Sequence, residues 1–122
     1  MNVDQHIDHD HKLVIFTITG SLTDEGLKGI ADTIETNPAI GREFGWLIDL
    51  RMSDGVKVTT ERVRQMASRH LALSAASRRA VVVPPGLGYA TAKVYQMLRG
   101  EGAPRVFTDY DEAYRWATTG RD

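Results

Sequence analysis

Short apolar runs alternate with longer stretches of helical spacing in this chain, and that alternation constrains its fold most strongly. The runs at residues 12–19, 46–50, 80–83 and 105–107 are rich in β-branched and aromatic residues, which is typical of strands. Apolar residues then recur every three or four positions, as in amphipathic helices. Strands joined through such helices have right-handed crossovers and form a mostly parallel sheet.

A further strand is expected at residues 3–9, before the polar turn DHDHK, and it pairs with the run at 12–19 as an antiparallel hairpin. The sequence therefore predicts an α/β fold in a single domain over residues 1–122, with the element order ββαβαβαβα. The expected sheet is mixed and mostly parallel, with about five strands, and four helices pack against it.

The limits of the helices can be read from capping residues. Thr23 is placed to cap the first helix, because two acids that suit a helix dipole follow it, and Asn37-Pro38 ends that helix. The third helix is expected around residues 90–98, and Asp109 can cap the last one.

Composition excludes several classes of protein. The formal net charge of -1 argues against a general nucleic-acid binder, which needs a basic surface. The chain has no cysteine, so disulfides and thiolate sites are excluded. No apolar run approaches the ~20 residues of a membrane span, and the N-terminus MNVDQHIDHDHK has no signal-peptide apolar region. A cytoplasmic protein is expected.

Chemistry in such a sheet usually lies at the carboxyl ends of the strands, where the loops 20–24, 51–59 and 84–88 should meet. Asp49 closes the strand before the second of these loops. Its carboxylate could be functional, but we favour a role in which it binds loop amides and holds the turn.

The segment MSDGVKVTT allows two interpretations. Ser53, Thr59 and Thr60 precede a helix, where backbone N–H groups and the helix dipole would stabilise a phosphate. In the second interpretation, which we favour, Asp54-Gly55 makes a turn and Thr59 or Thr60 only caps the helix.

The segment PPGLGY offers a second candidate site. Gly86, Gly88 and Tyr89 stand between a strand and a helix, where an anion or a small ligand could bind, with Tyr95 lining the site. The bland interpretation is that the prolines end the strand and begin the helix. Neither GxxxxGK[ST] nor GxGxxG is present.

Catalytic and metal-binding signatures are weak. His9 and His11 could share a strand face and bind a metal, but a solvated turn is the better interpretation of these residues. His70 is interpreted as a residue at the edge of the core. GxSxG, HExxH and CxxC are absent, so we expect no enzyme, no metal and no cofactor.

Basic residues gather around the expected second helix. They are Lys57, Arg62, Arg64, Arg69, Arg78 and Arg79. This group fits a solvated helix face, or a patch for an acidic protein partner or an anionic lipid surface.

The segments WLIDLR (46–51), TTERVRQMA (59–67), AVVVPPGLGYATAKVYQML (80–98) and RVFTDYDEAYRWA (105–117) together resemble the small bacterial STAS-like proteins called SpoIIAA-like. The resemblance covers nearly the whole chain. It implies a STAS (anti-sigma-factor antagonist) fold and a protein partner such as an anti-sigma-type regulator. Such antagonists carry a phosphorylated Asp-Ser-Ser-Gly type sequence. Here Met52-Ser53-Asp54-Gly55 replaces it, so a phosphorylation switch is doubtful.

The sequence thus predicts a non-catalytic regulatory or protein-interaction module that can form a homodimer. The expected partner-binding residues are Arg51, Ser53, Asp54, Thr59, Thr60, Arg62 and Arg64. The alternative is a small-molecule or lipid-binding protein that uses Gly86, Gly88 and Tyr89, since the lipid-transfer domains of CRAL-TRIO type have a related fold.

Overall fold

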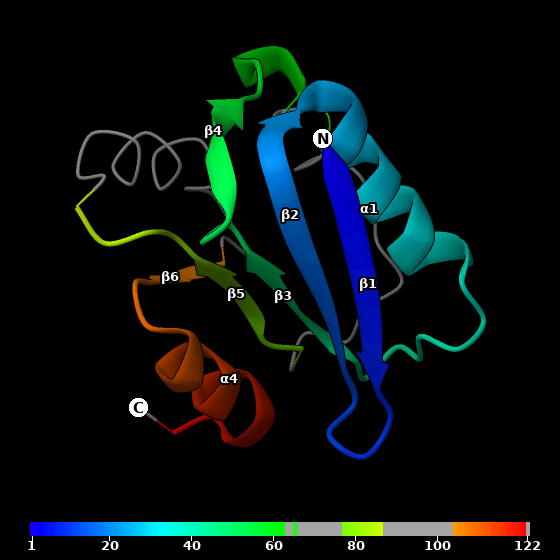
Figure 1. Ribbon diagram of the computed structural model, residues 1–122. Coiled ribbons are helices and arrows are strands. Elements are labelled where there is room, and N and C mark those ends of the chain that lie inside the picture. The colour runs from blue at the N-terminus through cyan, green and yellow to red at the C-terminus, as the bar shows by residue number, and fades with distance from the viewer. Residues whose placement is uncertain (63–64, 66–76, 87–103, 122) are drawn as a thin grey trace.

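A mixed β-sheet with helices on both faces forms the molecule (Figure 1). The computed structural model describes residues 1–62, 65, 77–86 and 104–121. Its elements, in chain order, are β1 (Asn2–Asp8), β2 (Leu13–Thr23), α1 (Asp24–Thr36), β3 (Gly45–Asp49), β4 (Ser53–Lys57), β5 (Arg79–Val82), β6 (Arg105–Phe107) and α4 (Tyr110–Thr119).

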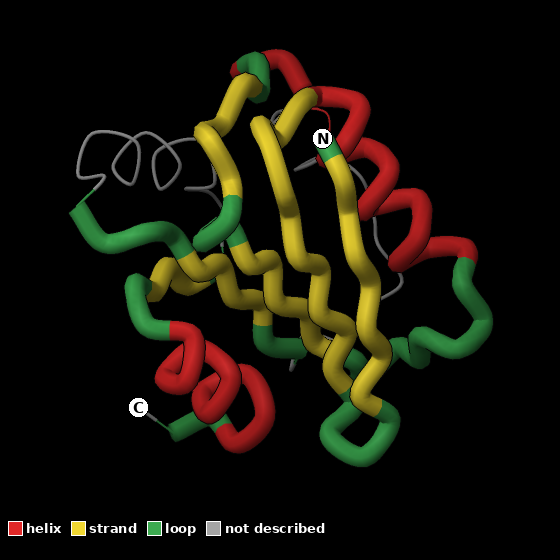
Figure 2. Tube along the Cα trace, in the orientation of Figure 1, coloured by secondary structure: helices red, strands yellow, loops and turns green. Residues whose placement is uncertain are grey.

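The sheet has six strands in the order β1-β2-β3-β5-β6, and β4 pairs with β2 outside this path. β1 and β2 form the expected antiparallel hairpin. All other pairs are parallel, which confirms the mixed, mostly parallel sheet. Figure 2 shows β1 as the last strand on one side of this sheet.

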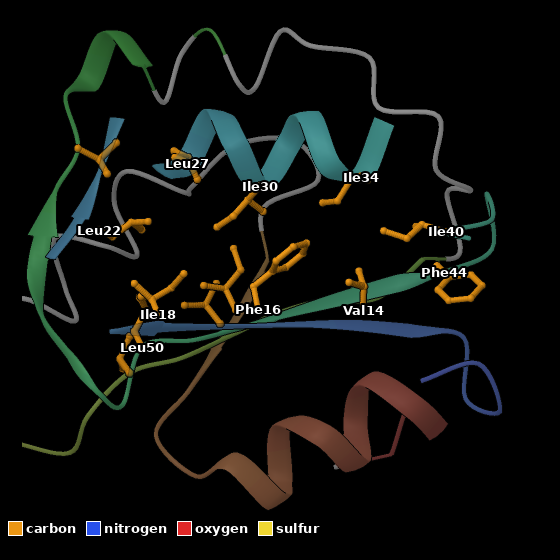
Figure 3. Close-up of a cluster of buried hydrophobic side chains, with 14 residues drawn as sticks. Val14, Phe16, Ile18, Leu22, Leu27, Ile30, Ile34, Ile40, Phe44 and Leu50 are labelled. Atoms are coloured by element: carbon orange, nitrogen blue, oxygen red, sulfur yellow. The ribbon is translucent and has the colours of Figure 1, made fainter. Parts of the chain in front are cut away.

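The helix α1 begins and ends where its capping residues predict. The Thr23 hydroxyl accepts a 3.2 Å hydrogen bond from the Gly26 backbone N–H, and Asn37 ends the helix. Leu27, Ile30 and Ile34 then share one buried face, because they recur at helical spacing. Figure 3 shows these three side chains pointing from α1 toward the sheet.

The apolar side chains of β2 alternate between the two faces of the sheet. Val14, Phe16 and Ile18 pack in one cluster with the buried face of α1 (Figure 3). Leu13 and Ile15 face the other way, into a second cluster that α4 covers. The core therefore consists of two layers, one on each side of the sheet.

The helix α4 closes the second layer. The Asp109 carboxylate accepts a 3.0 Å hydrogen bond from the Glu112 N–H and caps the helix, as the sequence predicts. Ala113 and Ala117 are buried against the sheet. Gly120 ends the helix in the left-handed region, with φ +76°.

Two sequence expectations about β2 and the loop 51–59 are wrong. Residues 20–24 are not a loop after the second strand, because β2 continues to Thr23 after a change of register between Gly20 and Ser21. The Ser53-Asp54-Gly55 segment is not a free turn but the start of β4, which pairs in parallel with the end of β2. The sheet consequently has six strands where about five were expected.

The middle helices are tested only in part. Residues 60–62 are helical, in agreement with a helix that begins after Thr59. Most of the remainder of that helix, with His70, and the whole of the expected helix at 90–98 lie outside the described residues, so the count of four helices stays a prediction.

Candidate functional site

The carboxyl end of β3 carries a buried acid that is held by its neighbour. Asp49 is only 2% exposed. One of its carboxylate oxygens accepts hydrogen bonds from the backbone N–H and Nε of Arg51, both at 3.0 Å, and the other accepts one from Nη2 at 2.9 Å. The sequence interpretation that Asp49 holds the turn is therefore confirmed.

The Arg51 side chain also contacts α4. Its guanidinium carbon lies 4.4 Å from the centroid of the Tyr110 ring, a cation–π arrangement. The hydrogen bonds to Asp49 raise the pKa of Arg51, so its charge is permanent. Burial, and then the charge of Asp49, raise the pKa of the Tyr110 hydroxyl.

Ser53 is used to join two strands. Its hydroxyl donates a 2.7 Å hydrogen bond to the Gly20 carbonyl oxygen and accepts one from the Gly55 N–H at 3.2 Å. The side chain is half-buried. A phosphate on this oxygen would remove the hydrogen bond from Ser53 of β4 to Gly20 of β2. The geometry therefore favours a structural role for Ser53 over a phosphorylation site.

Thr59 is the residue that caps the helical segment, which decides between Thr59 and Thr60. Its hydroxyl accepts a 3.1 Å hydrogen bond from the Arg62 N–H. The same hydroxyl donates to one carboxylate oxygen of Asp24 at 2.8 Å, and the Thr59 N–H donates to the other at 2.7 Å. The start of this segment is thereby tied to the start of α1.

Much of the chain near these fixed points is exposed, although Val58 is buried in the core. Arg51, Asp54, Lys57 and Thr60 all face solvent. Met52 is 66% exposed, the most exposed large apolar side chain among the described residues. We call residues 51–62 the 51–62 surface. Sequence reasoning named most of its polar members and missed Met52, although a methionine inside a polar turn is a visible signal.

Two further members of this surface were expected, and the structure describes one of them. Arg62 is half-buried, and its buried Nε makes no hydrogen bond within the described part of the chain. Arg64 lies outside the described residues.

The alternative ligand site is represented by one residue. Gly86 is exposed, with φ +84°, in a turn after β5. Gly88, Tyr89 and Tyr95 lie outside the described residues. The ligand site at this loop therefore stays a prediction.

Residues of the histidine-rich turn form a hydrogen-bonded cluster with α4. One Asp8 oxygen accepts a 2.6 Å hydrogen bond from the Tyr114 hydroxyl and lies 2.9 Å from Nδ1 of His11. Asp8 also accepts the His11 N–H at 3.1 Å. Among residues 1–62, 65, 77–86 and 104–121 no three His, Asp or Glu side chains are grouped so as to hold a metal ion.

The contact between Asp8 and Tyr114 shifts the pKa of both side chains. The Tyr114 hydroxyl, and then His11, lower the pKa of Asp8 from 3.8 to about 2. Asp8 in turn raises the pKa of Tyr114 from 10.0 to about 12. Sequence reasoning missed this cluster, because 106 positions separate its two partners.

One face of α4 connects the two polar clusters. The rings of Tyr110 and Tyr114, one helical turn apart, stack with centroids 6.3 Å apart. Arg51 lies over the first ring and Asp8 binds the hydroxyl of the second. The end of β3 and the β1–β2 turn are thus linked through α4.

The sheet starts with an antiparallel hairpin and continues in parallel through β3, β5 and β6, which is the mixed α/β architecture expected of a STAS-like module. The SpoIIAA-like family matches residues 13–118, and the chain belongs to that family.

A solved structure supports the same fold. An uncharacterised protein of the DUF3478 family with a SpoIIAA-like fold, from Shewanella loihica PV-4, superposes with a TM-score of 0.59 and 20% sequence identity. The match covers 95% of this chain and 92% of that protein. No curated protein matches the chain. Of the helices formed by described residues, none has the length and apolar character needed to cross a membrane.

Proposed function

We propose that this protein is a non-catalytic regulatory module that binds a protein partner through the 51–62 surface. The observation that carries the proposal is Met52, 66% exposed within a segment whose backbone is held on both sides. Protein contact sites place apolar side chains at their centre and polar ones around them, and Met52 with its polar neighbours fits this arrangement. A cytoplasmic location stays a prediction of the sequence.

Rigidity of this segment supports the proposal. Arg51 is fixed by Asp49, Ser53 by Gly20, and Thr59 by Asp24, each through hydrogen bonds. A surface that is already ordered loses little conformational entropy when a partner binds. The 51–62 surface therefore presents its side chains at a low cost in binding free energy.

The charges of this surface favour a partner that carries both positive and negative side chains. Arg51 and Lys57 are exposed beside Asp54 and Glu61, so both signs are present. Such a rim contributes to the choice of partner and to the association rate more than to the affinity. We propose a partner, such as an anti-sigma-type regulator, with an apolar pocket for Met52 and charges of both signs around it.

A phosphorylation switch is not part of the proposal. The hydroxyls of Ser53 and Thr59 both donate to acceptors inside the structure. Thr60 makes no hydrogen bond with any described residue. Of Ser53, Thr59 and Thr60, it is therefore the one whose hydroxyl is available for phosphorylation. Intact-mass measurement of protein from its native cells, under phosphatase inhibition, tests this: we expect no phosphate on Ser53 or Thr59.

Site-specific photo-crosslinking tests the interaction. A photoreactive residue replaces Met52 in one variant and Lys28, an exposed residue of α1, in the control. In native cells we expect a discrete protein adduct from position 52 alone, and loss of that adduct when Lys57→Glu is added. Identical adducts from both positions, or none from position 52, would contradict the proposal.

A further inference from the structure

The strand β1 ends the sheet with one edge unpaired by any described strand. β2 pairs with all seven residues of β1, from Asn2 to Asp8, and no other described strand pairs with β1. Residues 2–6 are exposed, and Val3 is 38% exposed. An edge of this length presents a row of backbone N–H and C=O groups that another strand can bind.

We propose that this edge pairs with β1 of a second copy of the chain, in an antiparallel arrangement with a two-fold axis at Gln5. In this register Gln5 lies opposite Gln5 of the other copy, and Asn2 opposite Asp8. The two sheets join into one, with α1 on the same side in both copies. The interface is isologous and closes as a dimer.

Polar complementarity of β1 with itself supports this register. Asp4 of one copy lies opposite His6 of the other, and the two-fold axis produces this pair twice. Neither side chain makes a hydrogen bond or an ion pair with another residue in the described part of the chain. Complementary side chains that lie directly across from each other on two strands stabilise the strand pair.

The apolar side of β1 is complementary as well. Val3 and Ile7 lie on the α1 side of the sheet, opposite Ile18 and Val14 of β2. In the proposed register Val3 of each copy lies opposite Ile7 of the other. The contact covers an exposed valine and extends the apolar cluster beneath α1 across the axis.

Neighbouring registers are less favourable. A shift that keeps the faces aligned moves the axis by one residue. It then places Asp4 opposite Asp4, or else Asp4 opposite Asp8 and His6 opposite His6. Like charges directly opposite one another destabilise a strand pair, and a parallel pairing in register would repeat them along the strand.

Charged residues also protect edge strands against pairing, and this rival explanation makes the opposite prediction. If Asp4 and His6 act in that way, the chain stays monomeric. If they form the proposed pairs, the chain dimerises, and changing either residue weakens the dimer. A measurement of self-association therefore separates the two explanations.

The experiment is sedimentation velocity of the full chain and three variants over a range of concentrations. We expect a monomer–dimer equilibrium in the original chain. His6→Asp should weaken the dimer by on the order of tenfold, because two favourable pairs become two like-charge pairs. Asp4→His should weaken it too. The double variant exchanges the two side chains and should restore the dissociation constant to within about threefold.

A second measurement locates the axis. The chain has no cysteine, so Gln5→Cys introduces a single thiol. Directly opposite residues of an antiparallel pair have Cα atoms about 4.5–5.5 Å apart, which a disulfide can span. Under mild oxidation we expect a covalent dimer of this variant, and none of the Lys28→Cys control.

Each result bears on the proposal. A chain that stays monomeric up to about 1 mM overturns it, as does a dimer unaffected by His6→Asp or equal cross-linking of both thiols. Recovery in the double variant supports the register specifically. The 51–62 surface is untouched by these changes, so a failure here is distinct from a failure of the proposed partner binding.

Discussion

The Thr59 hydroxyl donates a 2.8 Å hydrogen bond to the carboxylate of Asp24, the first residue of α1. The same hydroxyl accepts the Arg62 N–H, so one oxygen atom both caps a helical segment and joins it to another helix. Residues 35 positions apart are connected in this way.

This contact predicts the effect of a negative charge at Thr59. Thr59→Ala should lower the free energy of unfolding by about 1 kcal/mol, the usual effect of losing a cap. Thr59→Glu should lower it by about 2 kcal/mol, because it also places a second carboxylate beside Asp24. Urea unfolding followed by circular dichroism measures both. Adding Asp24→Asn should relieve part of the effect of Thr59→Glu; equal stability of Thr59→Glu and the original chain would show that the contact is not needed.

The buried carboxylate of Asp49 predicts a larger effect for its partner. Arg51→Met should lower the free energy of unfolding by about 2 kcal/mol, a value reduced for the 47% exposure of the arginine side chain. Arg51→Lys should recover less than half, since it keeps the charge and loses the paired N–H donors. Arg42→Met, at an exposed position, is the control. If both methionine variants unfold alike, Asp49 does not depend on Arg51.

The bond between Asp8 and Tyr114 predicts how stability changes with pH. The pKa of Asp8 is lower in the folded protein, so its contribution is complete above about pH 4 and is lost as the pH falls toward 2. The pKa of Tyr114 is higher when folded, so its contribution is complete below pH 10 and is lost as the pH rises toward 12. Both describe the same hydrogen bond.

Tyr114→Phe therefore should reduce stability by a constant amount, on the order of 1 kcal/mol, between about pH 4 and 10, and by less outside that range. Unfolding midpoints across the pH range test this. Tyr110→Phe is the matched control, because it removes a neighbouring hydroxyl and leaves the bond to Asp8 intact. A difference that does not shrink below pH 3 would contradict the assignment.

Two exposed glycines predict opposite effects of alanine. A Cβ atom at either Gly29 or Gly86 would meet no heavy atom within 4 Å, so packing does not distinguish them. Gly29 lies within α1, where alanine should stabilise by about 0.5–1 kcal/mol. Gly86 has φ +84°, so alanine there should destabilise by about 1 kcal/mol. Thermal unfolding of both variants tests the pair; the same sign for both would be inconsistent with these backbone conformations.

Local signals made much of the fold predictable. Thr23 and Asp109 cap the helices expected of them, because capping depends on residues three positions away in the sequence. The strand at Arg105–Phe107 has the expected limits, and the others differ by a few residues at their ends. The function of Asp49 in its turn was also local, since its partner is two residues away.

The missed features depend on contacts between distant segments. Ser53-Asp54-Gly55 has the composition of a turn, and the end of β2 makes it a strand, partly through the bond from Ser53 to Gly20. Tyr114 has no local signal for its bond to Asp8. Sequence named Arg51, Ser53, Asp54, Thr59 and Thr60 as one surface, but their internal hydrogen bonds could be seen only in three dimensions.

The pairing of β2 bears on the order in which the molecule folds. β2 is hydrogen-bonded to β1, β3 and β4, so three strands need it in place. The hairpin of β1 and β2 closes a short loop. The connections from β2 to β3 and β4 contain α1, so they close longer loops. We therefore expect the β1–β2 hairpin to form first during folding. Leu13–Thr17 lie between β1 and β3 and pair with both, so their amide protons should be among the last to exchange with solvent.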